Sequence, residues 1–590
     1  RGPDASSVWS QGPAGLGHTL LRTSWESEVE RQPATLNGRT WIVADARIDG
    51  RAGLISQLPP WGGASAEAET DPGLILRAYD RWGGDCVRHI HGDFAFAIWD
   101  SAERKLFCAR DHLGLKSFYY ALSDRSFLFS NTLSCLRLHP AVSGRLNDLA
   151  IGDYLLFGYK LNPSDTSFQA IHRLPPAHAM TVSEDVEPAR RYWSLDPRRR
   201  IQFRRPAEYV ERFTELFRTA VEDRTHCDQA GIFLSGGMDS SSVAAIAAGI
   251  FEHRANGGEL RAYTAVSDRD GVDTERYYSG IVASALGIPV QYLSVDDYMP
   301  FDRFDEEAVR GHEPGSTPLS AISCDQLRQV AQHSRVALTG DGGDHVLYPS
   351  RQYFFDLLRH GRVVRLAADA ASCIRILRRI PRFGFRAGLR HMLHKDNQLP
   401  PLPQWIDSGL ARRFDLAERW RQNAGQPPAE PSALRPEAFE RLSNSSLSSD
   451  FELNDPGVTQ CAVEVRCPLF DVRLVEYLLA IPPVPWNFDK GIVRAAMRGL
   501  LPEAIRLRPK TPLAQDPLVT RLQLPGCEWI DRFVAHPDLA TYVDRKSIPV
   551  LTSTGSANPW NDVRPAALNF WLNGLSRTSI LNGIHHAKRT

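Results

Sequence analysis

The stretch AGIFLSGGMDSSSVAAIAAGI, residues 230–250, constrains the fold more than any other part of the sequence. Its apolar run 232–234 is typical of a buried parallel strand, and the following segment, rich in Ala, Val and Ile, predicts a helix. The turn between them, SGGMDS at 235–240, holds two glycines that let the backbone approach a ligand closely. Because a helix N-terminus carries a partial positive charge, this strand–turn–helix unit predicts a site for an anion such as phosphate.

One carboxylate, Asp239, lies within this turn. A carboxylate faces phosphate oxygens favourably only when a cation separates them, and Mg²⁺ is the simplest such cation. The turn therefore predicts a phosphate ligand with a bound metal ion. Two other nucleotide-binding motifs are missing from the sequence, since it has no GxxxxGK[ST] string and no GxGxxG after a strand.

Composition narrows the class of protein. A chain of 590 residues is too long for one core, so two or three domains are expected. Lys plus Arg equals Asp plus Glu at 69 each, which argues against a nucleic-acid or anionic-membrane partner. The nine cysteines form no CxxC pair or zinc-type cluster and predict free, buried thiols in a reducing, cytoplasmic setting. No apolar run reaches the ~18 residues of a membrane span.

Residues 1 to about 195 have the pattern of an antiparallel, strand-rich domain. Short β-type runs recur between turn signals, and apolar residues share one helical face over 72–82. The pattern weakens around 188–200, which suits a linker, and from about 205 to 590 helices alternate with apolar strands, as in an α/β domain. The strands predicted in the first domain are 40–45, 94–99, 105–109, 117–120 and 126–130.

In the second domain, further strands are predicted at 260–266, 289–295 and 336–338, with helices between them. The last of these strands runs into a second glycine-rich turn, TGDGGD at 339–344, which adds Asp341 and Asp344. Because parallel strands present their ligand-binding turns at one edge of the sheet, the two turns are expected to meet. Together they predict the two halves of a nucleotide–metal site.

The two turns, in this order and spacing, resemble those of the asparagine synthetase family, and the first is similar to the pyrophosphate loop of ATP-pyrophosphatases. Other segments match that family in the same order over nearly the whole chain. Three resemble its N-terminal glutamine amidotransferase domain and three its synthetase domain: RGPD at 1–4, GDFAF at 92–96, RDHLG at 110–114, EVRCPLFD at 464–471, KGIVR at 490–494 and RPK at 508–510.

The resemblance implies an α+β domain followed by an α/β domain. The first, over 1–195, would be an antiparallel β-sandwich with helices, of the Ntn-hydrolase type. The second, over 205–590, would be a doubly wound parallel sheet of the ATP-pyrophosphatase type with added helices, and it would carry out the adenylation.

The resemblance also implies ATP and Mg²⁺ as cofactors and assigns their ligands. Asp239 and Asp344 would bind Mg²⁺, while Lys490 and Lys510 would face the phosphates and the charge that develops during adenylation. Glu464 and Arg466 are instead expected to form a buried structural ion pair. The residues matched to the ATP site are Leu234, Ser235, Gly236, Gly237, Asp239, Ser240, Val266 and Gly340.

The N-terminal domain departs from the family pattern where a working glutaminase would need its donors. The family's Asn-Gly-Glu stretch is replaced by ADARID at 44–49, and Leu20 stands where an arginine is expected after His18. Asp71 does match the family. We therefore predict a domain that is retained as a scaffold and has no glutaminase activity.

If ammonia is not made in place, the amine has to come with the substrate, and an amine and a carboxyl of one molecule give a lactam. The family's β-lactam branch has Tyr at the position of Asp341, paired with a Glu on a nearby helix. Here the turn carries an acid, which looks more like the lasso-peptide macrolactam cyclases, and Glu452 lies at about the partner's place. Asp341 or Glu452 could take the amine's proton, and the alternative that Glu452 only caps or bridges stays open.

The sequence is thus interpreted as an AMP-forming macrolactam synthetase that closes an isopeptide ring between an Asp or Glu side chain and the N-terminal amine of a peptide. Its expected partners are a precursor peptide and the leader peptidase or leader-binding protein that serves it. Two alternatives remain: an asparagine or β-lactam synthetase acting on a small amino acid, and a non-catalytic binding scaffold.

Overall fold

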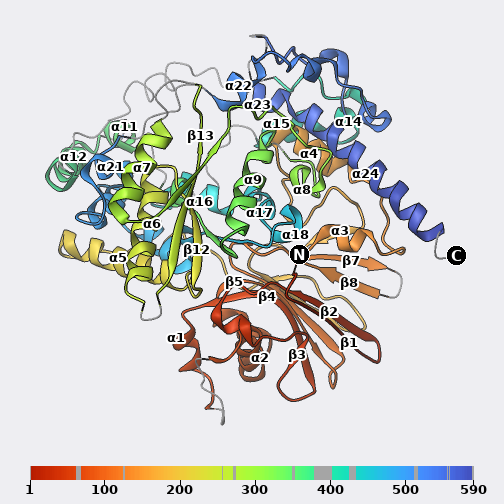
Figure 1. Ribbon diagram of the computed structural model, residues 1–590, viewed down its shortest axis with the longest axis horizontal. Coiled ribbons are helices and arrows are strands. Elements are labelled where there is room, and N and C mark those ends of the chain that lie inside the picture. Colours follow the sequence, from red (N-terminus) through yellow and green to blue (C-terminus); the bar gives the residue numbers. More distant parts are fainter. Residues whose placement is uncertain are drawn as a thin grey trace.

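Figure 1 shows the computed structural model, which describes residues 2–60, 68–123, 126–254, 257–269, 274–315, 317–347, 353–359, 361–377, 401–423, 433–509, 516–553, 556 and 558–587. The N-terminal domain occupies the lower part of that view. The parallel sheet and its helices lie above it, and the C-terminal helices cover the upper right.

The N-terminal domain is built on a six-stranded antiparallel sheet of order β11-β10-β6-β5-β4-β3. Strand β5 is buried along nearly its whole length because both faces of the sheet are covered. Phe94 and Phe96 face helix α2, while Ala95 and Ala97 face the layer that includes β2 and β8. The β1–β2 hairpin and the sheet β8-β7-β9 complete the sandwich.

The described elements of this domain are β1 (Ala5–Gln11), β2 (Ala14–Leu20), η1 (Trp25–Glu28), β3 (Ala34–Thr35), β4 (Thr40–Asp49), α1 (Arg51–Ile55), α2 (Asp71–Trp82), η3 (Gly83–Arg88), β5 (His91–Asp100), β6 (Lys105–Arg110), β7 (Tyr119–Ser123), β8 (Ser126–Ser130), α3 (Leu133–Arg137), α4 (Asp148–Phe157), β9 (Ile171–Arg173), β10 (His178–Val182) and β11 (Arg190–Arg191).

The five predicted strands are present, but β4 and β5 run further than the apolar runs 40–45 and 94–99 indicated. The extensions carry buried ions: Arg47 pairs with Asp49 and with Asp93 across the two strands. A prediction from apolar periodicity misses a strand segment with charged side chains, because it assigns them to solvent. Such side chains are buried only when they are paired. The predicted strand 117–120 is shifted to β7, and the exposed hairpin β1–β2 was not foreseen.

The second domain contains a parallel sheet of order β14-β13-β12-β15-β16. In Figure 1, α5, α6 and α7 lie on one side of the sheet and α9 on the other, and separate apolar clusters line the two faces. Because the chain leaves β12 toward β13 and returns to its other side at β15, the order of strands reverses between β12 and β15. Ligands of open α/β sheets bind at such a switch point.

The elements of the sheet region are α5 (Pro206–Glu222), β12 (Gln229–Phe233), α6 (Met238–Glu252), β13 (Glu259–Val266), α7 (Thr274–Leu286), β14 (Val290–Ser294), α8 (Glu307–Arg310), α9 (Ser320–Ala331), β15 (Val336–Leu338), α10 (Gly343–Val346) and β16 (Glu464–Arg466). The strands predicted at 260–266, 289–295 and 336–338 correspond to β13, β14 and β15. The motif strand β16 adds an edge that was not predicted.

The remaining chain is mainly helical, and its apolar cluster also takes in α4 of the N-terminal domain. Its elements are α11 (Tyr353–Arg359), α12 (Val363–Leu377), α14 (Ser408–Arg413), α15 (Leu416–Asn423), α16 (Pro436–Ser443), α17 (Ser446–Glu452), α18 (Pro456–Thr459), η4 (Pro468–Phe470), α19 (Val472–Ala480), η5 (Phe488–Lys490), α20 (Gly491–Ala496), α21 (Glu503–Arg506), α22 (Pro517–Leu522), η6 (Glu528–Arg532), η7 (Pro537–Thr541), η8 (Arg545–Ser547), α23 (Pro559–Asp562) and α24 (Arg564–Ala587).

Two expectations from composition can be compared with the fold. All nine cysteines are free, and most are buried, although Cys135 is exposed. Across the described ranges, no helix combines the length and the apolar character needed to cross a membrane.

Candidate functional site at the sheet edge

The two glycine-rich turns meet at the carboxyl edge of the parallel sheet, as the strand order predicted. A Cβ atom added to Gly343 would lie 2.1 Å from Cγ of Asp239, and one added to Gly340 would lie 2.5 Å from the backbone nitrogen of Ser240. A side chain at either glycine would therefore collide with the first turn. The absence of side chains lets turns from strands about 100 residues apart pack directly together.

The first turn is held in shape by its own serines. The hydroxyl of Ser240 accepts a hydrogen bond from the backbone N–H of Ser235 at 3.2 Å and lies 3.0 Å from the Ser235 hydroxyl. The buried residue Leu234 just before the turn is tied to the neighbouring strand, since the Thr264 hydroxyl donates to its carbonyl at 2.6 Å. Val266, at the end of that strand, is also buried. The turn is thus formed before any anion binds.

Lys490 lies where the two turns meet. Its ammonium group forms ion pairs with Asp239 and, at 2.9 Å, with Asp344. Burial alone would lower the pKa of Lys490, but the two carboxylates raise it above its ordinary value. The backbone of Asp489 and Lys490 is left-handed, with φ of 49° and 56°. Such conformations cost ~1–3 kcal/mol each and persist where the surrounding structure enforces them.

The donor set at this point fits a divalent cation. Asp239 and Asp344 supply hard carboxylate oxygens, which are the ligands that Mg²⁺ prefers. One ammonium group bridges both carboxylates, so they already converge on one positive charge. These two residues could hold Mg²⁺ once Lys490 turns toward bound phosphates.

Arg508 belongs to the same site, although the sequence analysis did not assign it a role. It donates to the Gly236 carbonyl at 3.3 Å, and its guanidinium carbon lies 3.7 Å from the centre of the Tyr278 ring. The contact fixes a second cation beside the phosphate turn. Its position in the RPK segment, two residues before Lys510, was the available signal. Lys510 itself lies outside the described residues.

A pair of acids lies on the other side of the second turn. Asp341 is open to solvent but enclosed by protein on most sides, and this loss of hydration raises the pKa of its carboxyl. Asp450, at the exposed face of α17, has its pKa raised to about 6 by the same enclosure and by the charge of Asp341. Carboxyls with raised pKa values suit proton transfer near neutral pH where a substrate can reach them, and both of these are exposed.

The sequence analysis placed Glu452 at about the position of a partner for Asp341 and left open that it only caps or bridges, and the structure shows it in buried ion pairs. Glu452 is buried and accepts two hydrogen bonds from Arg173, at 2.7 and 2.9 Å. Residues two apart on a helix point to different sides, so Asp450 and Glu452 cannot both face the Asp341 turn. The alternative that Glu452 bridges elements is the one the geometry supports.

Two more motif residues have structural partners. Glu464 and Arg466 form the predicted buried ion pair at 2.7 Å. Glu464 also accepts from Lys116 at 2.6 Å, which joins β16 to the N-terminal domain. Burial would raise the pKa of Glu464, but Arg466 and Lys116 hold it well below its ordinary range.

In the N-terminal domain, the segment 44–49 stands where the glutaminase donors are expected, and its polar groups bond to other residues of the chain. The backbone N–H of Ala44 donates to the Gln32 side chain at 2.6 Å, and that side chain donates back to the Ala44 carbonyl at 2.9 Å. Asp45 pairs with Lys116, and Asp71 pairs with Arg51. The polar groups around 44–49 are therefore used within the fold.

Comparisons with known proteins agree with this arrangement. A glutamine amidotransferase domain family matches residues 1–193, and the asparagine synthase family matches residues 212–573. The chain is 27% identical to asparagine synthetase [glutamine-hydrolyzing] 3 of Bacillus subtilis, over 95% of this chain and 90% of that protein. It is 26% identical to the amidase chyE of Penicillium rubens, over 82% and 77% of the two chains.

A third relative is a putative asparagine synthetase 2 of Methanocaldococcus jannaschii. The identity is 26%, over 76% of this chain and 85% of that protein.

Proposed function

The chain belongs to the asparagine synthase family and is an ATP-dependent amide-forming ligase, and we propose that the amide it forms is a ring-closing lactam within a peptide. An Asp or Glu side chain of the peptide would be the carboxyl and the peptide's N-terminal amine the nucleophile. The expected partners are a precursor peptide and the protein that binds or removes its leader.

The single observation that carries this proposal is the state of the N-terminal domain. The Ala44 backbone is saturated by Gln32, and no Asn-Gly-Glu stretch offers donors for glutamine. An amine supplied by the carboxyl's own molecule removes the need for glutamine hydrolysis. Holding both groups in one site also makes the condensation intramolecular, where effective molarities reach ~10⁵ M or more.

The sheet edge supplies the groups that bind and orient the nucleotide. The SGGMDS turn and the N-terminus of α6 would hold the phosphates, with Leu234 and Val266 beside the nucleoside. Lys490 and Arg508 would face the phosphate oxygens. ATP supplies the activating group for the carboxyl, and Mg²⁺ between Asp239 and Asp344 would offset the phosphate charge.

The acid pair would complete the reaction. Asp341 lies in the second turn and Asp450 on α17, and an ionised carboxylate there can accept the proton of the attacking amine. The amine nitrogen bonds to the carbonyl carbon, its proton passes to the carboxylate, and the carboxyl oxygen departs with AMP. A carboxylate with a pKa near 6 is ionised at pH 7 and is still a competent base.

Mass spectrometry of short peptides incubated with the protein, ATP and Mg²⁺ tests the proposal. Each peptide carries one Asp or Glu within reach of its N-terminus. We expect the loss of one water per peptide, with one AMP released. The matched control is the same peptide with an acetylated N-terminus, which has no amine and should stay linear. Ring formation by that control, or linear products throughout while ATP is consumed, would contradict a lactam synthetase.

A second candidate is asparagine synthesis, favoured by the Bacillus subtilis relative that matches along 95% of this chain. Aspartate with ammonium and ATP, and aspartate with glutamine and ATP, separate the cases. Asparagine formed from ammonium but not from glutamine would assign an ammonia-using synthetase. Glutamate released from glutamine would contradict the inactive glutaminase.

A further inference from the structure

Helix α17, which carries Asp450, is bonded to the N-terminal domain through Arg173 and Lys160. The guanidinium group of Arg173 makes the two bonds to Glu452 described above and also pairs with Glu313. Lys160 pairs with Glu313 at 3.0 Å, and the carbonyl of Lys160 accepts from Ser445 just before the helix. Arg173, Lys160 and Glu452 are buried, and Glu313 and Ser445 are partly buried. The N-terminal domain thus fixes both ends of α17.

The turn that carries Asp341 is held through Phe470. The Phe470 ring lies 5.5 Å from the His345 ring, next to the second turn, and 5.0 Å edge-on from Phe451, next to Asp450. Leu469 and Phe470 also pack against Gly342 within that turn. One aromatic side chain therefore separates the elements that carry the two acids and sets their spacing.

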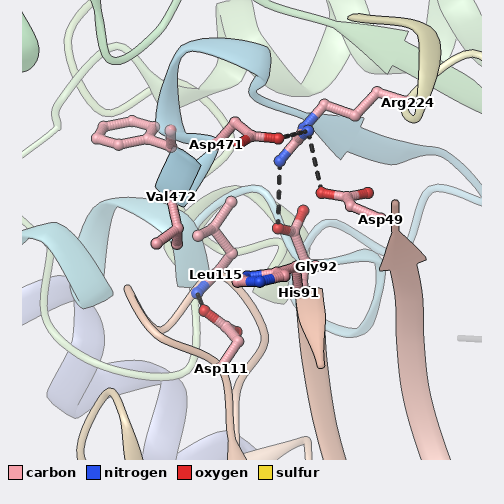
Figure 2. A pocket seen from close by; sticks show the side chains of 10 residues that line it. Asp49, His91, Gly92, Asp111, Leu115, Arg224, Asp471 and Val472 are labelled. Atoms are coloured by element: carbon pink, nitrogen blue, oxygen red, sulfur yellow. Dashed lines mark hydrogen bonds and ion pairs between the residues drawn. The ribbon is translucent and has the colours of Figure 1, made fainter. Parts of the chain in front are cut away.

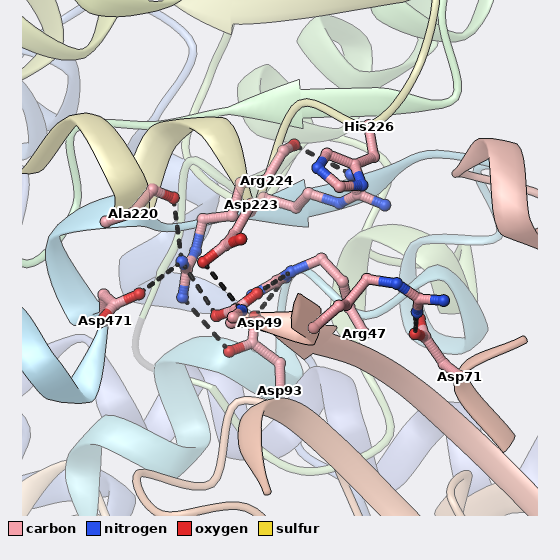
Figure 3. A network of polar contacts seen from close by, with 12 residues as sticks. Arg47, Asp49, Asp71, Asp93, Ala220, Asp223, Arg224, His226 and Asp471 are labelled. Atoms are coloured by element: carbon pink, nitrogen blue, oxygen red, sulfur yellow. Dashed lines mark hydrogen bonds and ion pairs between the residues drawn. The ribbon is translucent and has the colours of Figure 1, made fainter. Parts of the chain in front are cut away.

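Asp471, the next residue, anchors Phe470 to the N-terminal domain. Arg224 bonds to Asp471 at 3.0 Å and to Asp49 at 3.1 Å, and its other nitrogen lies 3.6 Å from Asp93 (Figure 3). Asp49 and Asp93 lie on β4 and β5. The ion pairs of Arg224 therefore run from the sheet of one domain to the segment that positions the Asp341 turn.

The space around this junction is closely filled. A cavity lined by Asp49, His91 and Asp471 has a volume of about 10 Å³, room for about one water (Figure 2). Asp49, Asp223 and Asp471 lie close enough to hold a metal ion, but Arg224 and Arg473 bridge them and balance their charge. A junction without free volume transmits a displacement instead of absorbing it.

We infer that the N-terminal domain sets the geometry of the Asp341–Asp450 pair, with Arg173 positioning Asp450 and Asp49 positioning Asp341 through Arg224 and Asp471. The inference rests on the proposed role of that acid pair in the amine step. The domain then contributes to ligation through contacts made far from the nucleotide. Arg173 and Asp49 are positioning residues, since neither touches the phosphate turn.

Two variants of the full chain separate this role from general stability. Arg173→Met removes the ion pairs to Glu452, and Arg173→Lys keeps the charge but loses the two-pronged contact. The control is Arg190→Met in the same domain, whose pair with Asp85 is exposed. Hydrogen–deuterium exchange reads the segments 446–452, 339–346 and 235–240. The activity probe is a peptide with one Asp or Glu and a free N-terminal amine, incubated with ATP and Mg²⁺ as in the test of the proposed function.

We expect Arg173→Met to raise exchange in 446–452 while leaving 235–240 unchanged. Amide formation should fall ~100-fold, as for a misplacement of about 1 Å, while pyrophosphate release in the presence of hydroxylamine stays within about twofold. Arg173→Lys should restore part of the amide rate, and Arg190→Met should match the unmodified chain. Unchanged exchange in 446–452, or equal losses of amide formation and pyrophosphate release, would overturn the inference.

The exchange measurement does not depend on the substrate. An unmodified chain that never releases pyrophosphate with any carboxylate would remove the proposed function and leave the exchange pattern to decide the positioning role. Asp49→Asn tests the second part of the inference, the positioning of Asp341. This variant should raise exchange in 339–346 and leave 446–452 unchanged. The opposite pattern would also overturn the inference.

Discussion

Two charged regions of the molecule differ in how deeply their ion pairs are buried. At the domain junction, Arg224 is buried and meets three carboxylates, and the Glu464 carboxylate meets both Arg466 and Lys116. At the sheet edge, one ammonium group serves two carboxylates, and the side chain of Asp344 is 58% exposed. The first region encloses its ion pairs within the fold, whereas the second presents the Asp344 carboxylate at an exposed edge of the sheet, where a ligand can reach it.

The pKa values follow the same division. Glu464, paired with Arg466 and Lys116 at the junction, has a pKa well below its ordinary range, so its carboxyl is ionised near neutral pH. Asp450, on the exposed face of α17, has a pKa of about 6 and changes charge near neutral pH. Burial beside cations keeps the first carboxyl in one charge state, whereas burial beside a second carboxyl lets the other change its charge near neutral pH.

Asp239→Asn tests the sheet edge most strongly. Loss of this carboxylate removes half of the proposed metal site, so ATP-dependent pyrophosphate release should fall by about 10³-fold. The thermal melting temperature should hardly change, because Lys490 keeps Asp344 as a partner. Asp85→Asn, an exposed acid of the N-terminal domain, is the control. Turnover within a few-fold of the unmodified chain would remove the metal assignment.

Glu464→Gln should show the reverse pattern at the junction. It leaves Arg466 buried without its carboxylate and Lys116 with Asp45 alone, which should cost about 3 kcal/mol of unfolding free energy in urea titrations. Pyrophosphate release per folded molecule should stay unchanged. Because the folded pKa of Glu464 is depressed, its contribution is present above about pH 4, the ordinary range of a glutamate, and is lost as the pH falls further. The variant's deficit should therefore shrink in acid, and a deficit independent of pH would contradict the pairing.

Asp450→Asn should lower amide formation by about 10²-fold and leave pyrophosphate release intact. In the unmodified chain the amide rate should rise as the pH increases through about 6, because the carboxylate must lose its proton to act as a base. The variant should lack this rise. Glu452→Gln separates the neighbouring acids, since it should lower stability and keep the rise near pH 6. A variant of Asp450 with the unmodified pH profile would exclude it as the base.

Arg508→Met should have the smallest effect. It removes one cation beside the phosphate turn and the contact with the Tyr278 ring, so the KM for ATP should increase by about tenfold with little change in kcat. Arg506→Met, which breaks an ion pair with Glu503 nearby, serves as the control. A fall in kcat without a change in KM would place Arg508 in the reaction instead of in nucleotide binding.

The sequence was sufficient for features that arise from local chemistry. The two glycine-rich turns and the strands before them were predicted from apolar runs and from the glycines in the turns. A side chain at Gly340 or Gly343 would collide with the first turn. Their convergence followed from the parallel order of the strands. The buried pair of Glu464 and Arg466 was also predicted correctly.

What the sequence could not supply depends on partners far along the chain. The extension of β4 through Arg47 and Asp49 is stable only because Arg224 and Asp93 meet it from other elements. Which of Asp450 and Glu452 is buried depends on which side of α17 faces the N-terminal domain. Arg173, 279 positions before Glu452, bonds to Glu452 and so fixes that side. No local pattern carries that information.

The strand order of the parallel sheet has one practical consequence. Since β12 and β15 are neighbours, the two glycine-rich turns keep their separation regardless of how much chain connects them. The chain between β12 and β15 could be lengthened in a surface loop without altering the distance between the turns. New termini could also be introduced in such a loop in a circular permutant. A fluorescent reporter inserted in such a loop would then leave the two glycine-rich turns at the same separation.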